Sequence, residues 1–299
     1  TGDTQHVADI NSASTTVTMP AEDISVTATY EDLTYTVSAS AGVGGDIDPK
    51  TWTVSHGEST TFTVTPNQGY RIDTVTGCGG TLNGSTYTTG PVTADCTVEA
   101  SFSPSPITDP DPGNPDKEVT ATVQGGGSSN WVFTEGGNEK DQTAGFIPVS
   151  GHPKSPSVDP PAGYDFPHGL FDFVLHLGEE GTVATINIEY PEPLPVGTVY
   201  WKYGPTAQND TPHWYVLPEG NGSGTVSFSA DRRTITLRIQ DGGLGDDDLT
   251  ANSLIYDQGG PGVPLAGPVS IPTMSQWGLI IMSVLFLLSA LFMMRRGRI

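Results

Sequence analysis

The sequence is poor in basic residues: its 299 residues hold 12 Lys and Arg against 34 Asp and Glu. Nucleic acids and anionic lipid surfaces are bound through clusters of basic side chains, so this charge balance excludes both as partners. The sequence also lacks a GxSxG elbow, an HExxH pair and a catalytic-type cysteine. We therefore expect a protein that is not an enzyme.

Cysteine is scarce, and Cys78 and Cys96 are its only two copies. Two cysteines alone would bind a metal ion only weakly, and no nearby His completes a zinc site. In an exported domain a disulfide is favoured instead. Closing such a short loop contributes roughly 3 kcal/mol on the chain-entropy model.

Long hydrophobic runs are missing with one exception, residues 277–294 (WGLIIMSVLFLLSALFMM). As a helix these residues extend roughly 27 Å, close to the ~30 Å hydrocarbon core of a bilayer, where only a helix satisfies its own backbone. Three arginines follow at 295, 296 and 298, which favours a cytoplasmic C-terminus and an external remainder. A buried core helix is the alternative, but nothing else in the chain is apolar enough to surround it.

The part before Ile271 has a composition that suits export. It carries nine basic and all 34 acidic residues, a net charge of −25, which favours solubility and leaves divalent cations as candidate ligands. Its 37 Gly and 25 Pro, counted over the whole chain, favour short strands and turns. We expect two or three domains. The chain begins at Thr1 with no signal peptide, so we expect a mature form or a fragment.

An internal repeat relates residues 20–30 (PAEDISVTATY) to residues 92–102 (VTADCTVEASF). The matching pairs are Asp23 and Asp95, Val26 and Val98, Ala28 and Ala100, and Tyr30 and Phe102. Apolar residues alternate in both copies, which predicts a half-buried strand in each. Residues 1–31 are therefore interpreted as the tail of an upstream unit, and residues 32–102 as one whole unit. Further strands of that unit are predicted at residues 34–38, around 52–54 and at 60–64, with Gly and Asn turns between them.

Residues 32–102 resemble the bacterial repeat domains of surface proteins. The resemblance rests on GYRIDTVTGCGGTLNGSTY (69–87) and TADCTVEASF (93–102). It implies a spacer or an adhesive stalk and no chemistry.

Residues 103–117 (SPSPITDPDPGNPDK) are rich in Pro and Asp, which predicts a semi-rigid linker. A second domain follows over residues 118–263, with turns between short alternating segments. The predicted strands are around Val119–Val123, Trp131–Phe133, Leu170–Leu177, Thr182–Tyr190, Thr198–Tyr203, Trp214–Leu217, Gly224–Ser229 and Arg233–Ile239. This spacing favours an antiparallel β-sandwich, jelly-roll-like in connectivity. Residues 258–270 (QGGPGVPLAGPVS) are predicted to be a flexible stalk.

The second domain resembles the choice-of-anchor U domain over roughly residues 150–263. The shared phrases are FPHGLFDF (166–173), YPEPLPVGTVYWKYGP (190–205), TPHWYVLP (211–218) and DGGLGDDDLTAN (241–252). Such domains stand next to one of several C-terminal anchors, so the resemblance implies a location rather than an activity.

Three features of this domain are candidate sites. Oxygen ligands for calcium are offered by Asp241, Asp246, Asp248 and Asn252, although the spacing is not that of an EF-hand and an acidic turn is the alternative. Aromatic rings for stacking on sugars are offered by Trp201, Tyr203, Trp214 and Tyr215, which a sandwich core would also contain. His168, His176 and His213 are candidates for a metal or hydrolytic site, with structural hydrogen bonds as the alternative.

The C-terminal residues 264–299 carry the phrase IPTMSQWG before the apolar run. It resembles the IPTL-CTERM sorting signal of exported proteins of Gram-negative bacteria, with Met274 and Gln276 as departures. Five residues match the usual form: Ile271, Pro272, Thr273, Trp277 and Gly278. The resemblance implies an exosortase-type membrane transpeptidase as partner, and either cleavage near Pro272–Thr273 or a retained membrane anchor.

Together these features predict an all-β chain in which a small repeat domain precedes an antiparallel sandwich and a C-terminal transmembrane helix. The predicted function is that of a structural or adhesive component, first anchored in the inner membrane and then at the cell surface or outside the cell. Surface glycans and the extracellular matrix are its candidate partners. The alternative is a surface glycan-binding module, with calcium ordering its acidic loop. No cofactor is required by the first hypothesis.

Overall fold

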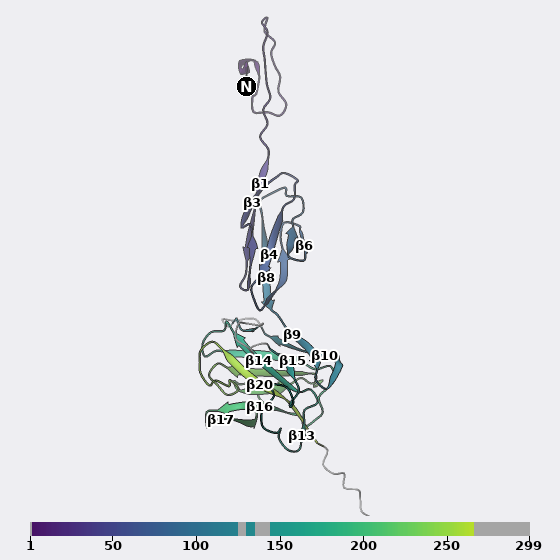
Figure 1. Cartoon of the computed structure of the whole chain (residues 1–299). Coiled ribbons are helices and arrows are strands. Elements are labelled where there is room, and N and C mark those ends of the chain that lie inside the picture. The colour runs from purple at the N-terminus through teal and green to yellow at the C-terminus, as the bar shows by residue number, and fades with distance from the viewer. Residues whose placement is uncertain (1, 125–129, 135–143, 266–299) are drawn as a thin grey trace, which may run out of the picture.

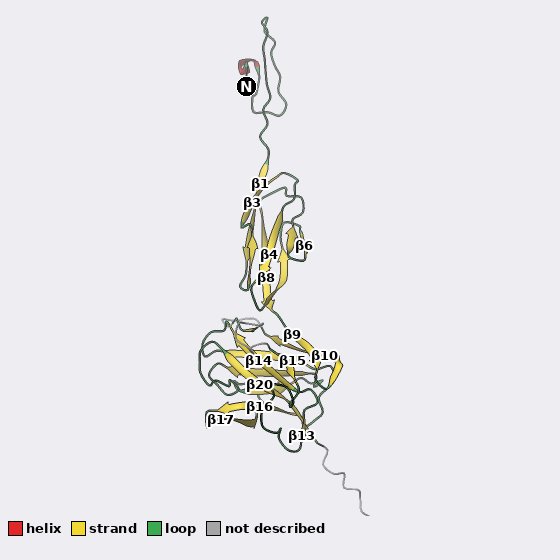
Figure 2. Cartoon of the chain, viewed as in Figure 1, coloured by secondary structure: helices red, strands yellow, loops and turns green. Residues whose placement is uncertain are grey.

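The computed structural model describes residues 2–124, 130–134 and 144–265. Among these residues the chain is built of strands, and the single helical turn is η1 (Thr4–His6). An extended N-terminal segment leads into a narrow first domain, and a wider second domain follows it (Figures 1 and 2). The predicted all-β class is confirmed.

Residues 2–33 do not form the strand that their alternation predicted. They pair only through isolated bridges, Gly2 with Val26 and Val7 with Val17, and Tyr30 stays 91% exposed. In the second copy of the repeat, by contrast, Val98 lies in a strand between two others, and the core between the two sheets buries it fully. Residues 2–33 supply no such pair of flanking strands, and alternation alone does not bury a strand.

The first domain packs two four-stranded sheets around one core, with strand orders β3-β1-β8-β5 and β2-β4-β7-β6. Its strands are β1 (Thr34–Ala41), β2 (Gly45–Asp48), β3 (Thr51–Ser55), β4 (Thr61–Pro66), β5 (Tyr70–Thr76), β6 (Thr81–Asn83), β7 (Thr86–Thr88) and β8 (Cys96–Pro104). Alternate residues such as Val37, Phe62 and Val64 fill the space between the sheets. The predicted strands around residues 34–38, 52–54 and 60–64 are confirmed.

The predicted disulfide is also confirmed. Cys78 and Cys96 are bonded, with their Cα atoms 5.6 Å apart and 18 positions apart in sequence. The bond joins the loop after β5 to the first residue of β8, and both side chains pack against the core.

The second domain is a sandwich of a five-stranded and a seven-stranded sheet. The first has the order β18-β19-β15-β10-β9, and the second has the order β11-β14-β20-β16-β17, with β12 on β14 and β13 on β20. Its strands are β9 (Ile107–Asp111), β10 (Asn114–Val123), β11 (Val132–Phe133), β12 (Gly145–Ile147), β13 (Tyr164–Asp165), β14 (Leu170–His176), β15 (Val183–Glu189), β16 (Val199–Thr206), β17 (Asn209–Val216), β18 (Thr225–Phe228), β19 (Thr234–Gln240) and β20 (Ile255–Pro264).

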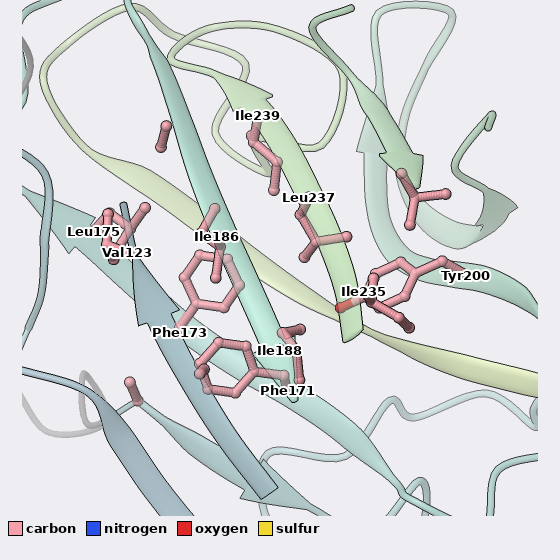
Figure 3. Packing of buried hydrophobic residues seen from close by; sticks show 14 of the residues in the cluster. Val123, Phe171, Phe173, Leu175, Ile186, Ile188, Tyr200, Ile235, Leu237 and Ile239 are labelled. Carbon is pink, nitrogen blue, oxygen red and sulfur yellow. The ribbon is translucent and has the colours of Figure 1, made fainter. Parts of the chain in front are cut away.

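Strict alternation builds the core of this sandwich. Ile186 and Ile188 of β15 and Leu237 of β19 are fully buried between the sheets, and the residues between them face outward. Phe171 and Phe173 of β14 cover them from the opposite sheet (Figure 3). The predicted antiparallel sandwich is confirmed. Its predicted strands are present, although β10 and β17 each begin five residues earlier than predicted.

The predicted linker 103–117 is wrong. Its residues form the end of β8, all of β9 and the start of β10, and β9 pairs with β10 as a hairpin around Pro112 and Gly113. Pro110 is tolerated because β9 is the edge strand of its sheet, where one side needs no donor, and Pro115 falls where the pairing of β9 with β10 is interrupted. The first and second domains are therefore joined by two residues, Ser105 and Pro106.

The predicted stalk 258–270 is wrong in its first half. Residues 255–264 form β20, which lies between β14 and β16 near the middle of the seven-stranded sheet. Its glycines are needed because neighbours approach closely: a Cβ on Gly260 would lie 2.2 Å from the Gly169 carbonyl oxygen. Pro261 is tolerated because pairing with β14 ends at Gly259 and pairing with β13 starts at Val263. The domain boundary thus lies at or after Pro264.

No helix in the described ranges 2–124, 130–134 and 144–265 is long and apolar enough to cross a membrane. The predicted transmembrane helix at residues 277–294 lies outside those ranges, as does the second half of the predicted stalk.

Candidate functional site

The acidic loop runs from β19 to β20, and its carboxylates bind the loop's own backbone. The buried Asp241 side chain accepts hydrogen bonds from the backbone amides of Gly181, Asn252 and Ser253, the last at 2.8 Å. Asp246 is also buried and accepts from the amides of Gly242 and Tyr256. These bonds hold the loop against the end of the sandwich.

Asp248 also forms its hydrogen bonds within the loop. It accepts bonds from the Thr250 amide and the Asn252 side-chain amide, both at 2.8 Å. Within residues 2–124, 130–134 and 144–265 no group of three or more His, Cys, Asp or Glu side chains is arranged to hold a metal ion. The geometry favours the acidic-turn interpretation over the predicted calcium site at Asp241, Asp246, Asp248 and Asn252.

The four aromatic residues proposed for sugar binding divide between two faces of the seven-stranded sheet. Trp201, Tyr203 and Trp214 share the outer face, where Tyr203 pairs with Trp214 across β16 and β17. Tyr215 pairs with Lys202 and packs against the main core on the inner face.

The outer three rings are themselves partly covered. Tyr164 stands edge-on to Trp201 at 5.2 Å between ring centroids, and Phe166 lies 5.5 Å from Trp214. Both indoles belong to a small second core with Ile147. This arrangement is that of packed cross-strand pairs rather than an open stacking surface.

The three histidines bind separate local partners. The three pairs are His168 Nδ1 with Asp111 Oδ2 at 2.8 Å, His176 Nδ1 with Thr134 Oγ1 at 3.1 Å, and His213 Nδ1 with the Thr211 carbonyl oxygen at 2.9 Å. The structure thus favours structural hydrogen bonds over a shared hydrolytic or metal site.

The strongest chemical feature of the domain is a charge cluster inside the sandwich that the sequence reasoning missed. Lys202 of β16 is fully buried, and its Nζ lies 2.6 Å from Oδ1 of the buried Asp257 of β20. Asp247 of the acidic loop places Oδ1 3.8 Å from the same Nζ. The ammonium also donates to the Gly245 carbonyl oxygen. One lysine therefore faces two carboxylates in the core.

Two glycines make room for this cluster. A Cβ on Gly204 of β16 would lie 2.1 Å from the Asp247 carboxylate, and a Cβ on Gly259 of β20 would lie 2.7 Å from the ring of Tyr200. Gly259 is also the register partner of Lys202. The sheet thus has a hollow in which the lysine, the carboxylates and the Tyr200 ring fit together.

Burial dominates the electrostatics of the cluster. It raises the pKa of Asp247 to about 8, with Lys202 opposing the shift and Asp257 adding to it. It raises the pKa of Asp257 to about 6 against the opposing charge of Lys202. Burial alone would lower the pKa of Lys202, but the carboxylates of Asp257 and Asp247 outweigh it and raise that pKa above its usual range. Burial thus opposes ionisation of both carboxylates, and the two carboxylates favour the charged form of Lys202.

One sequence signal pointed to Lys202. In the segment VYWKYG (199–204) the alternation that buries Tyr200 also turns Lys202 inward, so a lysine stands where the pattern requires an apolar residue. Asp257 gives no comparable signal, because the residues after it, QGGPGVP (258–264), have the Gly and Pro content of a connection and predict no strand.

Comparison with known protein families finds a match at each end of the chain. The model of the divergent InlB B-repeat domain matches residues 1–34 and again residues 35–106, so two repeats lie in tandem. The model of the IPTL-CTERM motif matches residues 269–298. No curated protein and no solved structure matches the chain.

By these matches the chain is similar to exported surface proteins that carry a repeat domain and a C-terminal sorting signal. The IPTL-CTERM motif implies processing by a sorting transpeptidase. The motif residues Ile271, Pro272, Thr273, Met274, Trp277 and Gly278 lie outside the described part of the chain. The resemblance of residues 150–263 to the choice-of-anchor U domain is not among the matches.

Proposed function

We propose that the protein is a non-enzymatic component of the cell surface that acts as a structural or adhesive stalk. The observation that carries this proposal is the order of its parts: two tandem repeats at one end and a sorting motif at the other. The end-to-end arrangement of the two domains supports it, because such a chain spans distance away from its attachment point (Figure 1). We also propose that the sandwich is of the choice-of-anchor U type.

The attachment would proceed through the tail. Residues 277–294 would span the inner membrane of a Gram-negative bacterium, with the three following arginines in the cytoplasm. An exosortase-type transpeptidase would then recognise the motif and cut near Pro272–Thr273, which releases the chain or transfers it to another carrier.

Mass spectrometry of the mature C-terminus, prepared from the envelope and the medium of the native host, tests this route. We expect a terminus near Pro272–Thr273. A matched variant, Trp277→Ala, keeps the apolar run nearly intact and should accumulate uncut. An intact Ile299 in surface-exposed wild-type protein would refute processing and leave a single-pass anchor.

The stalk role has its own test. Host cells carrying the wild-type gene are compared in attachment to surfaces and to each other with cells whose gene lacks residues 1–106, the two matched repeats. A shorter stalk should reduce attachment while leaving export and C-terminal processing unchanged. Equal attachment would refute the adhesive role.

Glycan binding remains the alternative function. It requires accessible rings, whereas Trp201 and Trp214 each pack under another aromatic side chain. A glycan array probed with the wild type, Trp201→Ala and Trp214→Ala decides between the two. Binding that both substitutions abolish in folded protein would favour the alternative over the stalk.

A further inference from the structure

The sandwich brings one lysine and one aspartate into reacting distance on adjacent strands. Strands β16 and β20 are antiparallel neighbours with Lys202 opposite Gly259, so Asp257, two residues along β20, lies on the same face as the lysine. Nζ of Lys202 is 2.6 Å from Oδ1 of Asp257. Since a carboxylate C–O bond is about 1.2–1.3 Å, Nζ lies within about 4 Å of the carboxyl carbon, near the roughly 3–3.5 Å of a near-attack geometry.

The pair is poorly satisfied as a plain ion pair. Both side chains are fully buried, and buried charges are normally stabilised by several further hydrogen bonds. In the described part of the chain, neither oxygen of Asp257 has a hydrogen-bond partner besides Lys202. The hydroxyl of the neighbouring buried Tyr200 is also unpaired there. The carboxylate of Asp257 therefore stands in the core with Lys202 as its one partner among the described residues, whereas Lys202 also contacts Asp247 and the Gly245 carbonyl oxygen.

We propose that Lys202 and Asp257 form an intramolecular amide bond that covalently joins β16 to β20. This inference rests on the interior of the sandwich and is independent of the proposed stalk function. Folding would accelerate this reaction by holding the amine and the carboxyl group in contact, because well-oriented intramolecular reactions reach effective molarities of roughly 10⁵–10⁸ M. Exclusion of water from the core protects the amide from hydrolysis.

The reaction is a condensation whose atoms balance. A proton passes from the Lys202 ammonium to the Asp257 carboxylate, which leaves a neutral amine and a neutral carboxylic acid. The Nζ lone pair attacks Cγ of Asp257 and forms the C–N bond. The C–O bond to one carboxyl oxygen then breaks, and that oxygen leaves as water with the acid proton and one proton from Nζ. The products are one amide and one water.

Asp247 is placed to carry protons between these atoms. Its Oδ1 is 3.8 Å from Nζ, and its side chain is 21% exposed, so it connects the buried pair to solvent. Gly204 leaves the space that its carboxyl occupies. A protonated Asp247 would donate to the carbonyl oxygen of Asp257 as negative charge develops there, and it returns to the same state after water leaves.

The test is mass spectrometry of the purified, folded full-length chain after denaturation and reduction of its disulfide. We expect a mass lower than that of the sequence by one water. Tandem spectra should locate the loss on a peptide pair joined through Lys202 and Asp257, since trypsin cannot cut after an acylated lysine. The location is needed because succinimide formation at an Asp-Gly sequence, such as Asp241–Gly242, also loses water.

Two variants separate the bond from other causes. Lys202→Arg keeps a positive charge and should restore the full sequence mass. Lys154→Arg is the matched control, because Lys154 pairs with Asp172 at 2.9 Å on a less buried site and its replacement should leave the mass loss unchanged.

A third variant tests the proton carrier. Asp247→Ala should slow the loss of water at least tenfold in protein that retains its native circular dichroism. Joined peptides in the wild type support the bond even if a variant fails to fold. Folded wild-type protein at full sequence mass without joined peptides, or a mass loss that persists in folded Lys202→Arg, would overturn the proposal.

Discussion

Removing the disulfide should lower the stability of the first domain by an amount that the structure sets. The bond closes a loop over a sequence separation of 18, for which the chain-entropy model gives about 3 kcal/mol. A domain of this size shifts its melting temperature by about 4–8 °C for each kcal/mol. Cys78→Ala/Cys96→Ala should therefore melt roughly 12–24 °C lower than the wild type.

Differential scanning calorimetry of the two-domain protein measures this shift. The transition of the second domain should stay in place, because the bond lies wholly within the first domain. Reduced wild-type protein is the matched control, since it loses the bond and keeps both side chains packed on the core. A first-domain shift below about 5 °C, or an equal shift of both transitions, would refute the loop-closure reasoning.

Three further predictions concern the second domain. Gly260→Ala should lower its free energy of unfolding by about 2–3 kcal/mol in chemical denaturation, because a Cβ there would meet backbone atoms. Gly222→Ala is the control, since a Cβ at that position would meet nothing within 4 Å and should change the free energy little. Equal effects of the two substitutions would contradict the close-packing argument. Trp214→Ala should cost about 2–4 kcal/mol in the same assay, because the indole packs between Phe166 and Tyr203; native stability in this variant would show that the ring is dispensable for packing. The domain should also be more stable near pH 5 than near pH 8. Burial raises the folded-state pKa of Asp246 to about 6 and that of Asp247 to about 8, so the stabilisation present below their unfolded pKa is lost as pH rises through these values. Unfolding followed by tryptophan fluorescence should detect a loss on the order of 1–3 kcal/mol, and a flat or rising profile would contradict the assigned shifts.

Alternation predicted most of the second domain because its strands bury one face against the opposite sheet. Ile186 and Leu237 stand at every second inward position, and the strands that contain them were predicted to within a residue or two. The same rule failed for residues 24–30, where burial depends on neighbouring strands that local sequence does not specify.

The misassigned segments share a cause. Gly and Pro are normally turn and linker residues, so their abundance predicts a semi-rigid linker at residues 103–117 and a flexible stalk at residues 258–270. In the folded chain, tertiary context explains these residues instead. Residues 107–111 form an edge strand that accepts proline, and the glycines of β20 leave room for the close approach of Gly169 and Tyr200. Because β20 was missed, Asp257 could not be placed beside Lys202.

The placement of β20 also determines how traction would pass through the molecule. The N-terminal repeats enter the sandwich through β9, at the edge of one sheet, whereas the chain leaves toward the sorting motif through β20, inside the other sheet. On the proposed stalk function, tension between a distant contact and the cell would therefore cross the packed interior instead of running along a single sheet. β20 pairs with β13 at residues 263–264, with β16 over residues 259–262 and with β14 over residues 255–259, so a pull on the tail would load these three pairings in that order.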